Sequence, residues 1–334
     1  MKKMVFFLLL LLFVLLFPFL SSDEGMPLSV LSDTSAETDT AHYPVIIDTY
    51  DAVGAPMQTT FTHPPARIIV DEVNALETLL ILGQGERIVG AALNTSGVSY
   101  ARLQREYPEE FAKVAPVIQN TIGREQAVAL QPDFILAWKA SFAPRWYGST
   151  AWWQERGVNT YVIATANHVL KDATIEDECR FIDDMGRIFD RKEQTDALVR
   201  EIHAELRVDE EAMRGREQQT VLVVEVGEGD ILNYDEGWVV GDMVRRLGGR
   251  IPLTSKYIGE EELLSCDPDV IFVAYNDAYG KRFAEHFFAS VRFNSLRAVQ
   301  HGRIYFVPVE YVYTPAFKTL DGIRAIRRGL YPDE

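Results

Sequence analysis

The sequence has only two cysteines, Cys179 and Cys266, among its 334 residues. Exported domains that depend on disulfides are rich in cysteine, so a disulfide framework is not what stabilises this chain. The two thiols fall in different halves of the sequence, and we expect both to be unpaired and mostly buried. A hydrophobic core of ordinary composition must then supply the stability.

Positive charge is also scarce. Lysine and arginine together number 33 against 49 aspartates and glutamates, which gives a formal net charge of -16. A surface this negative repels phosphate backbones and anionic lipid headgroups, so the composition argues against a nucleic-acid-binding protein.

The common catalytic and cofactor motifs are missing. Gly83-Gln84-Gly85 lacks a third glycine and Gly227-Glu228-Gly229 opens no periodic helix, so no dinucleotide site is expected. The sequence contains neither a zinc-binding His-Glu-x-x-His nor a Gly-x-Ser-x-Gly nucleophile turn. We expect no enzyme and no cofactor, although a carbohydrate-active enzyme with two distant carboxylates stays open as an alternative.

Histidine spacing predicts no metal site either, because metal sites that can be recognised from sequence need ligands at short, regular intervals. The histidines considered are scattered along the chain: His63, His168, His203, His286 and His301.

The N-terminal segment 1–22 has the composition of an export signal. Lys2 and Lys3 precede an almost unbroken run of Leu, Phe and Val from Met4 to Leu20. The run is long and its cleavage site is only fair, so an uncleaved membrane anchor is the alternative. No cysteine lies nearby to carry a lipid. The following segment, 23–42, is rich in Ser, Thr, Asp and Glu, and is predicted to be a flexible spacer.

After the spacer, short apolar strands alternate with helices in two halves. The first half is predicted to hold a hairpin at 43–48 and 58–62, strands at 67–70, 87–91, 133–137 and 160–163, and helices at 74–82, 125–130 and 152–156. The second half is predicted to hold strands at 220–225, 270–273 and 303–307 and a helix at 239–247. This alternation predicts parallel sheets that are covered on both faces.

Between the halves, apolar residues at helical spacing run from Ile175 to Phe189 and resume after Asp190-Arg191-Lys192. The second stretch, 193–214, is predicted to be one long, highly charged helix that Gly215 ends. We therefore expect the α/β class with two Rossmann-like lobes, 43–190 and 216–334, whose mainly parallel sheets are joined by a single long interdomain helix at 191–215.

A repeated segment relates the two halves. The segments 125–135 (EQAVALQPDFI) and 261–271 (EELLSCDPDVI) each place a glutamate seven residues before a Pro-Asp pair that opens an apolar strand. Proline ends the helix and the strand follows, so each copy is the same helix-turn-strand unit. Two copies on either side of one helical region predict two related lobes.

In this order, the segments resemble the periplasmic binding proteins that serve ferric siderophores, haem and cobalamin, whose two α/β lobes are joined by one long helix. Besides the two Pro-Asp units, the resemblance is carried by 65–70 (PARIIV), 77–83 (ETLLILG), 87–90 (RIVG), 247–249 (LGG), 296–305 (LRAVQHGRIY) and 330–332 (LYP). The segment 135–140 (ILAWKA) is similar to the cobalamin-binding members in particular.

The resemblance implies a receptor of an ABC importer in the periplasm. Such a protein captures a ferric siderophore or similar metal chelate, with cobalamin or haem as alternatives, and delivers it to a permease dimer. We expect a monomer. In the family, glutamates at the positions of Glu125 and Glu261 dock onto permease arginines, although the helix dipole alone also favours a carboxylate at each of these helix starts.

The ligand is expected between the lobes, because open α/β sheets bind ligands beyond the carboxyl ends of their strands. Aromatic side chains there would offer flat faces, and cations would meet acidic groups. The predicted ligand-binding residues are Asn74, Trp138, Lys139, Arg145, Tyr234, Trp238, Tyr275, Tyr279 and Tyr311. The same loops also carry Asp71, Glu72, Asn94, Thr95, Ser96, Trp146, Tyr147, Asn233, Asn276 and Tyr313.

Overall fold

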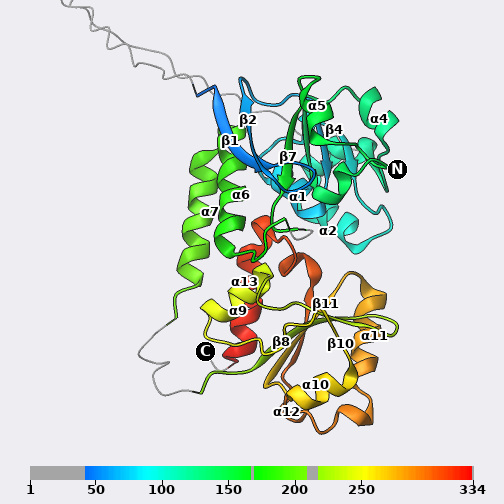
Figure 1. The fold of residues 1–334 in the computed structure, drawn as a ribbon, viewed down its shortest axis with the longest axis vertical. Helices are drawn as coiled ribbons and strands as arrows, with labels where there is room; N and C mark the ends of the chain where they lie inside the picture. The colour runs from blue at the N-terminus through cyan, green and yellow to red at the C-terminus, as the bar shows by residue number, and fades with distance from the viewer. Residues whose placement is uncertain (1–41, 167–168, 209–216, 333–334) are drawn as a thin grey trace, which may run out of the picture. The chain divides into compact units, whose positions relative to one another are not determined.

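The computed structural model describes residues 42–166, 169–208 and 217–332 (Figure 1). The predicted export signal and nearly all of the predicted spacer lie outside these residues. Within the described ranges, no helix has the length and apolar character that crossing a membrane requires.

The first lobe is built on a five-stranded parallel sheet. Its strand order is β5 (Ile118–Gln119), β4 (Ile88–Ala92), β3 (Ile68–Asp71), β6 (Phe134–Trp138) and β7 (Asn159–Ile163). The predicted hairpin is confirmed, with β1 (Val45–Tyr50) antiparallel to β2 (Pro56–Phe61). The helices of this lobe are α1 (Val73–Ile81), α2 (Val98–Glu106), α3 (Pro108–Val114), α4 (Arg124–Ala129) and α5 (Thr150–Gln154).

The second lobe repeats the strand order. It runs β10 (Tyr257–Ile258), β9 (Ile231–Asn233), β8 (Val221–Val226), β11 (Val270–Tyr275) and β12 (Ile304–Pro308), and β9 is antiparallel to both of its neighbours. The helices are α9 (Val239–Arg246), α10 (Glu260–Cys266), α11 (Ala278–Phe288), α12 (Arg297–Gln300) and α13 (Thr319–Leu330). The predicted α/β class with mainly parallel sheets is thereby confirmed.

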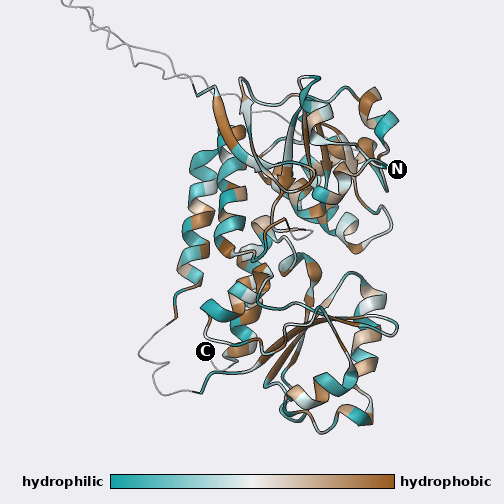
Figure 2. Ribbon diagram, in the orientation of Figure 1, coloured by the Kyte–Doolittle hydropathy of each residue, from teal (hydrophilic) through white to brown (hydrophobic). Residues whose placement is uncertain are grey.

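Both sheets are covered on both faces, which explains their unbroken apolar runs. Alternate residues of β6 enter different cores: Phe134 and Leu136 join one cluster, and Ile135 and Ala137 join another. Strand β8 divides its side chains between two cores in the same way. Figure 2 shows these strands as hydrophobic, while α6 (Ile175–Ile188) and α7 (Lys192–Glu205) carry many hydrophilic residues.

The repeated segments form equivalent units in the two lobes. Before β6, the Asp133 carboxylate accepts hydrogen bonds from the backbone N–H groups of Ala66 (2.7 Å) and Arg67 (2.9 Å), which lead into β3. Before β11, the Asp269 carboxylate accepts from the backbone N–H of Thr220 (2.8 Å), which leads into β8. Each aspartate therefore fixes the start of the neighbouring central strand.

The helical region between the lobes differs from the prediction. In its described residues it forms two neighbouring helices, α6 (Ile175–Ile188) and α7 (Lys192–Glu205) (Figure 1). Helix α7 ends at Glu205, nine residues earlier than the predicted end at 214, and residues 209–216 lie outside the described part of the chain. The Arg327 side chain from α13 explains this end, because it donates to the carbonyl groups of Glu205 and Arg207 (2.8 Å for the latter).

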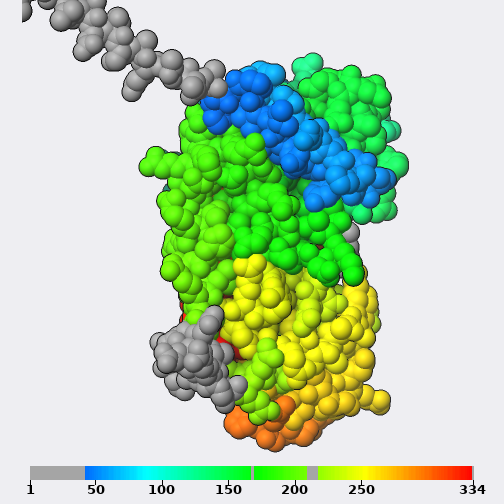
Figure 3. Space-filling model, turned by 60° about the vertical axis from the view of Figure 1, so that its left-hand side comes forward, coloured from blue at the N-terminus to red at the C-terminus, as the bar shows by residue number. Residues whose placement is uncertain are grey.

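Helices α6 and α7 together span both lobes. At the start of α6, the Ile175 backbone N–H donates to Asp242 of α9 (3.0 Å), and at its end the Tyr43 hydroxyl donates to the Ile188 carbonyl (2.6 Å). Helix α7 returns to the second lobe, where Glu205 pairs with Arg327 (3.2 Å). In Figure 3 the green surface that includes α6 and α7 lies between the blue hairpin and the yellow second lobe.

Candidate functional site: the cleft between the lobes

A cavity of about 350 Å³ lies where the strand-end loops of the two lobes face each other. Its first-lobe lining lies at the ends of β3 and β6, which is the carboxyl-end position typical of open α/β sheets. Its second-lobe lining comes from the carboxyl ends of β8, β11 and β12 and, in about equal number, from residues in or beside β9 and β10. The lining residues are Glu72, Val73, Asn74, Trp138, Glu225, Leu232, Tyr234, Trp238, Lys256, Tyr257, Asn276, Val309, Glu310 and Tyr313.

Two further cavities continue this cleft. One of about 470 Å³ shares Val73 and Asn276 with the first cavity and extends along residues 93–99 to Tyr279. Another of about 210 Å³ shares Trp138 and is also lined by Trp146. The cleft is therefore larger than its central cavity alone.

Aromatic rings cross the cleft from one lobe to the other. The ring centroid of Tyr313 lies 6.0 Å from that of Trp138 at the end of β6 and 5.5 Å from that of Trp238 before α9. Tyr234 continues the series at 5.1 Å from Trp238. The Trp138 Nε1 atom is buried and has no acceptor among the described residues, which leaves one hydrogen-bond donor of this ring unsatisfied.

Three carboxylates line the same cavity. Glu72 is buried and caps α1 by accepting from the Ala75 backbone N–H (2.5 Å), and its burial raises the pKa of its carboxyl to about 8. Glu225 accepts hydrogen bonds from the Tyr234 hydroxyl (2.9 Å) and from the side-chain amide of Asn276. Lys256, at the exposed side, is the basic residue among the lining residues of this cavity. The wall is therefore aromatic and rich in acidic groups.

The third carboxylate, Glu310, belongs to the second lobe but is held by the first. It accepts from the Ser99 hydroxyl and lies 3.3 Å from the Arg102 Nε atom, with both partners on α2. Asn74 makes a further link, because its amide donates to the carbonyls of Glu310 (3.0 Å) and Thr314 (2.9 Å). Glu310 and Asn74 therefore both line the cavity and connect the two lobes.

A buried ion cluster reinforces that attachment. Glu77 of α1 is fully buried and accepts two hydrogen bonds from Arg102, at 2.9 and 2.8 Å, while Lys318 from the second lobe lies 3.2 Å away. Burial raises the pKa of the Glu77 carboxyl, but Arg102 and Lys318 outweigh this effect and hold it below its usual range.

The structure gathers only part of the predicted ligand-binding set. Asn74, Trp138, Tyr234 and Trp238 line the central cavity, and Tyr279 lines the neighbouring one. Of the other loop residues, Glu72, Asn276 and Tyr313 line the central cavity, Asn94, Ser96 and Asn276 the larger neighbour, and Asp71 and Trp146 the smaller one.

Four predicted residues lie elsewhere. The Lys139 ammonium faces the β1–β2 turn, where a Cβ on Gly54 would lie 3.6 Å from its Nζ. Arg145 is exposed, with its guanidinium 5.5 Å from the Trp146 ring, and Tyr275 at the end of β11 lies beside Lys281 instead of in the cavity lining. Tyr311 is half-buried, and its pKa is raised by burial and by Asp321 on α13. These four do not line the three cavities.

Three of the other strand-end loop residues line none of the three cavities and instead contact other parts of the protein. Tyr147 is buried, and burial together with the facing Asp71 carboxylate raises the pKa of its hydroxyl. Asn233 is buried and donates to the Leu253 and Ser255 carbonyls, both at 3.0 Å. Thr95 is exposed and donates through its backbone N–H to Asn120 (3.0 Å).

The prediction missed the residues that make the cavity acidic. The sequence pattern places Glu225 at the last position of a predicted strand and Glu310 in no predicted element, so it points to neither residue as part of the cavity lining. The sequence holds a weak indication of this role, because both residues stand at or just after the carboxyl end of an apolar strand.

The two glutamates predicted to dock are both exposed, on the first turns of α4 and α10. The neighbours of Glu261 have other roles: Glu260 pairs with Arg292 (2.8 Å), and Glu262 accepts from the Gly259 backbone N–H (2.9 Å).

The cysteines are unpaired, as expected, with Cys179 buried on α6 and Cys266 half-buried on α10. His63, His286 and His301 are exposed in separate parts of the chain, and His168 lies outside the described residues.

Comparisons with known proteins agree with this architecture. Residues 68–311 match the model of a periplasmic binding protein family. An uncharacterised ABC transporter substrate-binding lipoprotein of Bacillus subtilis, YvrC, is 20% identical over 308 residues, or 90% of each chain. A periplasmic binding protein from Veillonella parvula has a similar structure, with a TM-score of 0.78 at 24% identity, over 87% of this chain and 92% of that one.

Two further solved structures share the fold at lower identity. An ABC-type Fe3+-hydroxamate transport protein from Saccharomonospora viridis gives a TM-score of 0.66 at 20% identity, covering 86% of this chain and 99% of the other. The petrobactin-binding protein YclQ of Bacillus subtilis gives 0.62 at 15% identity, with the same coverage of both chains.

Proposed function

Because the chain belongs to the periplasmic binding protein family, whose members are solute-binding proteins, we propose that it captures a ferric siderophore or similar metal chelate. The cleft between the lobes is the proposed site, and the chelate is then delivered to an ABC importer. The observation that carries the proposal is the row of aromatic rings that crosses the cleft through Trp138, Tyr313 and Trp238. Such rings offer rigid apolar faces at little entropic cost to the organic shell of a chelate.

The charge of the cleft narrows the ligand class. Glu225, Glu310 and Glu72 line the central cavity, but Glu72 holds a proton near neutral pH and Arg102 offsets the charge of Glu310. Glu225 accepts from two neutral groups, so its negative charge would repel an anionic ligand. Three hydroxamate groups neutralise Fe3+, whereas three catecholates leave an excess of negative charge. We therefore propose a neutral or cationic chelate, such as a ferric hydroxamate. The transport proteins of similar fold that are named for hydroxamate and petrobactin support the siderophore class.

Cobalamin is the second candidate, since a flat macrocycle would also stack on these rings. Haem fits less well, because its propionates would meet the same carboxylates. The carbohydrate-active alternative receives no support from the relatives, which are binding proteins.

Delivery is proposed to use Glu125 and Glu261. Both are exposed, and they occupy matching positions on the equivalent helices α4 and α10. A two-fold permease could meet both at once.

Ligand titration followed by tryptophan fluorescence and calorimetry tests the proposal. We expect saturable binding of a neutral or cationic ferric hydroxamate and much weaker binding of an anionic ferric catecholate and of haem. The iron-free hydroxamate serves as the control. If none of the ferric chelates binds and cobalamin does, the siderophore assignment is overturned. If no member of the panel binds, the cleft assignment fails as well.

A further inference from the structure

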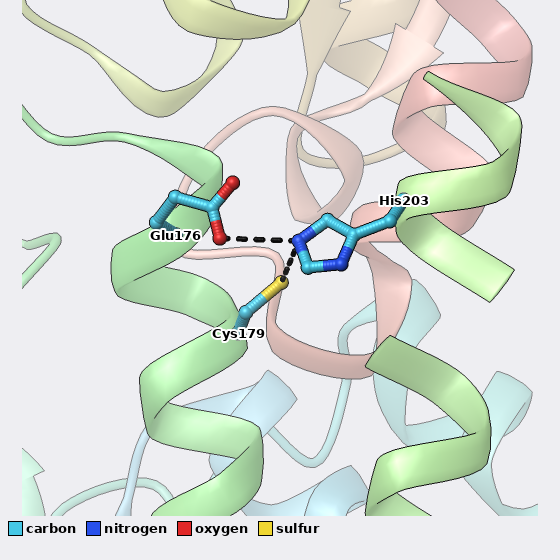
Figure 4. A group of neighbouring side chains, drawn as sticks. All are labelled: Glu176, Cys179 and His203. Carbon is cyan, nitrogen blue, oxygen red and sulfur yellow. Dashed lines mark hydrogen bonds and ion pairs between the residues drawn. The ribbon is translucent and has the colours of Figure 1, made fainter. Parts of the chain in front are cut away.

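Helices α6 and α7 bring three metal-ligating side chains together outside the ligand cleft. Glu176 and Cys179 lie one turn apart on α6, and His203 faces them from α7 (Figure 4). The three do not line the cleft cavities. Each offers a ligand atom of a different kind, namely carboxylate oxygen, thiol sulfur and imidazole nitrogen.

Two of the three spacings between these atoms are close to the edges of a tetrahedral site. Zinc–ligand bond lengths and tetrahedral angles place nitrogen and oxygen about 3.3 Å apart, and nitrogen and sulfur about 3.6 Å apart. The His203 Nε2 atom lies 3.1 Å from Glu176 Oε2 and 3.9 Å from Cys179 Sγ, and all three ligand atoms lie within 4.8 Å of one another. The two distances from His203 are within a few tenths of an ångström of these edges, and the carboxylate and thiol would have to approach each other by at most about 1 Å to hold one ion.

The surroundings suit a divalent cation. Arg246 of α9 bonds Glu176 through the other carboxylate oxygen, Oε1 (2.8 Å), which leaves Oε2 for a metal, and Asp242 balances the charge of Arg246 (2.9 Å). Burial, with the negative field of Glu176 and Glu178, raises the pKa of the Cys179 thiol to about 12. A metal must displace that proton, but the same negative field attracts a cation.

We propose that Glu176, Cys179 and His203 form a binding site for Zn2+ or a similar borderline transition-metal ion. Mixed sulfur, nitrogen and oxygen ligands favour zinc over Mg2+ or Ca2+, which prefer oxygen alone. Glu176 and His203 are exposed, so solvent can supply the fourth ligand. The ion would join α6 to α7 beside the Glu176–Arg246 contact with the second lobe, which makes it a structural clamp on the region that spans both lobes.

The test uses the full chain, freed of metal by chelation and kept reduced, at about pH 8 to favour thiolate ligation. Calorimetry with Zn2+ is expected to show one tight site. Co2+ is expected to give a thiolate-to-cobalt charge-transfer band and tetrahedral d–d bands. Zinc should also raise the melting temperature in a concentration-dependent way.

Cys179→Ser and His203→Ala are each expected to weaken zinc binding by about 100-fold or more. Cys179→Ser should also abolish the charge-transfer band. Cys266→Ser and His286→Ala are the matched controls and should change neither readout. Circular dichroism identifies any variant that fails to fold, and loss of the cobalt band in a folded Cys179→Ser protein is then decisive.

Two results would overturn the proposal. The first is the absence of a tight zinc site in the wild-type chain, which would leave an ordinary His–Glu ion pair beside a buried thiol. The second is undiminished zinc affinity and an intact cobalt spectrum in Cys179→Ser. Neither result bears on chelate binding in the cleft, which is measured separately with a metal-saturated ligand.

Discussion

At the scale of single residues, the properties of the cleft depend on the aromatic and carboxylate side chains that line it. Trp138 and Trp238 come from opposite lobes and meet through Tyr313, so each wall supplies one large ring. The negative charge of the cavity lining comes from Glu225 and from Glu310, which Arg102 partly offsets, whereas Glu72 holds a proton near neutral pH. The aromatic rings therefore determine which ligand shapes fit the cleft, and the carboxylates determine which ligand charges it accepts.

Replacing either cleft tryptophan should weaken ligand binding. We expect Trp138→Ala and Trp238→Ala each to raise Kd about ten-fold or more, because a desolvated aromatic contact commonly contributes over about 1 kcal/mol. Calorimetry with whichever chelate of the titration panel binds measures this change. Trp152→Ala is the control, since Trp152 lies on α5 under Arg156 and should leave Kd unchanged. Unaltered affinity in both cleft variants would show that the ligand binds elsewhere.

The buried Glu72 carboxyl should make stability depend on pH. Its pKa is raised from 4.5 to about 8, so between these values the folded state holds a proton that the unfolded state has lost. The contribution is fully present below about pH 4.5 and is lost as the pH rises through about 8, with a slope of at most about 1.4 kcal/mol per pH unit.

Melting temperatures measured across this window check the prediction. Glu72→Gln should flatten the decline at rising pH, whereas the exposed Glu125→Gln should leave the profile unchanged. A Glu72→Gln profile that parallels the wild type would show that this carboxyl is ionised in the folded protein.

At the scale of elements, the α6–α7 pair depends on a close helix crossing. Gly186 of α6 faces Thr195 of α7, and a Cβ at Gly186 would lie 2.1 Å from the Thr195 Oγ1 atom. Thr195 is itself fully buried, so it has little space to move. The glycine therefore sets the distance between the two helices.

Gly186→Ala should destabilise the protein by about 1–3 kcal/mol, because overpacking outweighs the helix-propensity gain of alanine. Denaturant unfolding measures the loss, and the double variant Gly186→Ala/Thr195→Ala should recover part of it. Gly280→Ala in α11 is the control, because its nearest neighbour would lie 3.5 Å away, an ordinary contact distance. A stability gain in Gly186→Ala would contradict the packing argument.

At the scale of the whole molecule, several independent contacts hold the lobes together. They include α6 and α7, the Glu77–Arg102–Lys318 cluster and the Asn74 amide. Closure around a ligand would have to bend two helices and disturb a buried ion cluster.

We therefore expect free and ligand-bound forms to differ by only a few degrees of lobe rotation. Small-angle scattering should show almost the same radius of gyration before and after ligand addition. A marked decrease would mean that the cleft contacts break and re-form during binding.

Transport should depend on the two exposed glutamates. Glu125→Ala/Glu261→Ala should retain ligand affinity and nearly the same melting temperature, because a helix-start carboxylate contributes only about 0.3–1 kcal/mol. Uptake in cells or proteoliposomes should nevertheless fail, since two charge pairs that orient the complex are lost. Glu109→Ala/Glu285→Ala removes the same charge from exposed positions of both lobes and should transport normally. Wild-type uptake by the first double variant would contradict the docking role and would mean that Glu125 and Glu261 only stabilise the starts of their helices.

The sequence by itself determined the features that depend on neighbours along the chain. Apolar runs between turn residues predicted the central strands, and the two Pro-Asp segments predicted the equivalent helix-turn-strand units that Asp133 and Asp269 complete. Trp138 could be placed at the cleft because it is the last residue of β6, and Trp238 because it stands in the loop between a predicted strand and the predicted helix at 239–247. Short helices and strands without a clear apolar period, such as α2, α3 and β9, were not predicted.

Only the tertiary structure decided features that depend on partners far apart in the sequence. Arg327 ends α7, Lys139 lies beside the β1–β2 turn, and α2 holds Glu310 at the cavity wall. The grouping of Glu176 and Cys179 with His203 likewise needs two separate helices to pack. No local pattern encodes such contacts, because their free energy comes from burial and charge pairing between elements that meet only when the chain has folded.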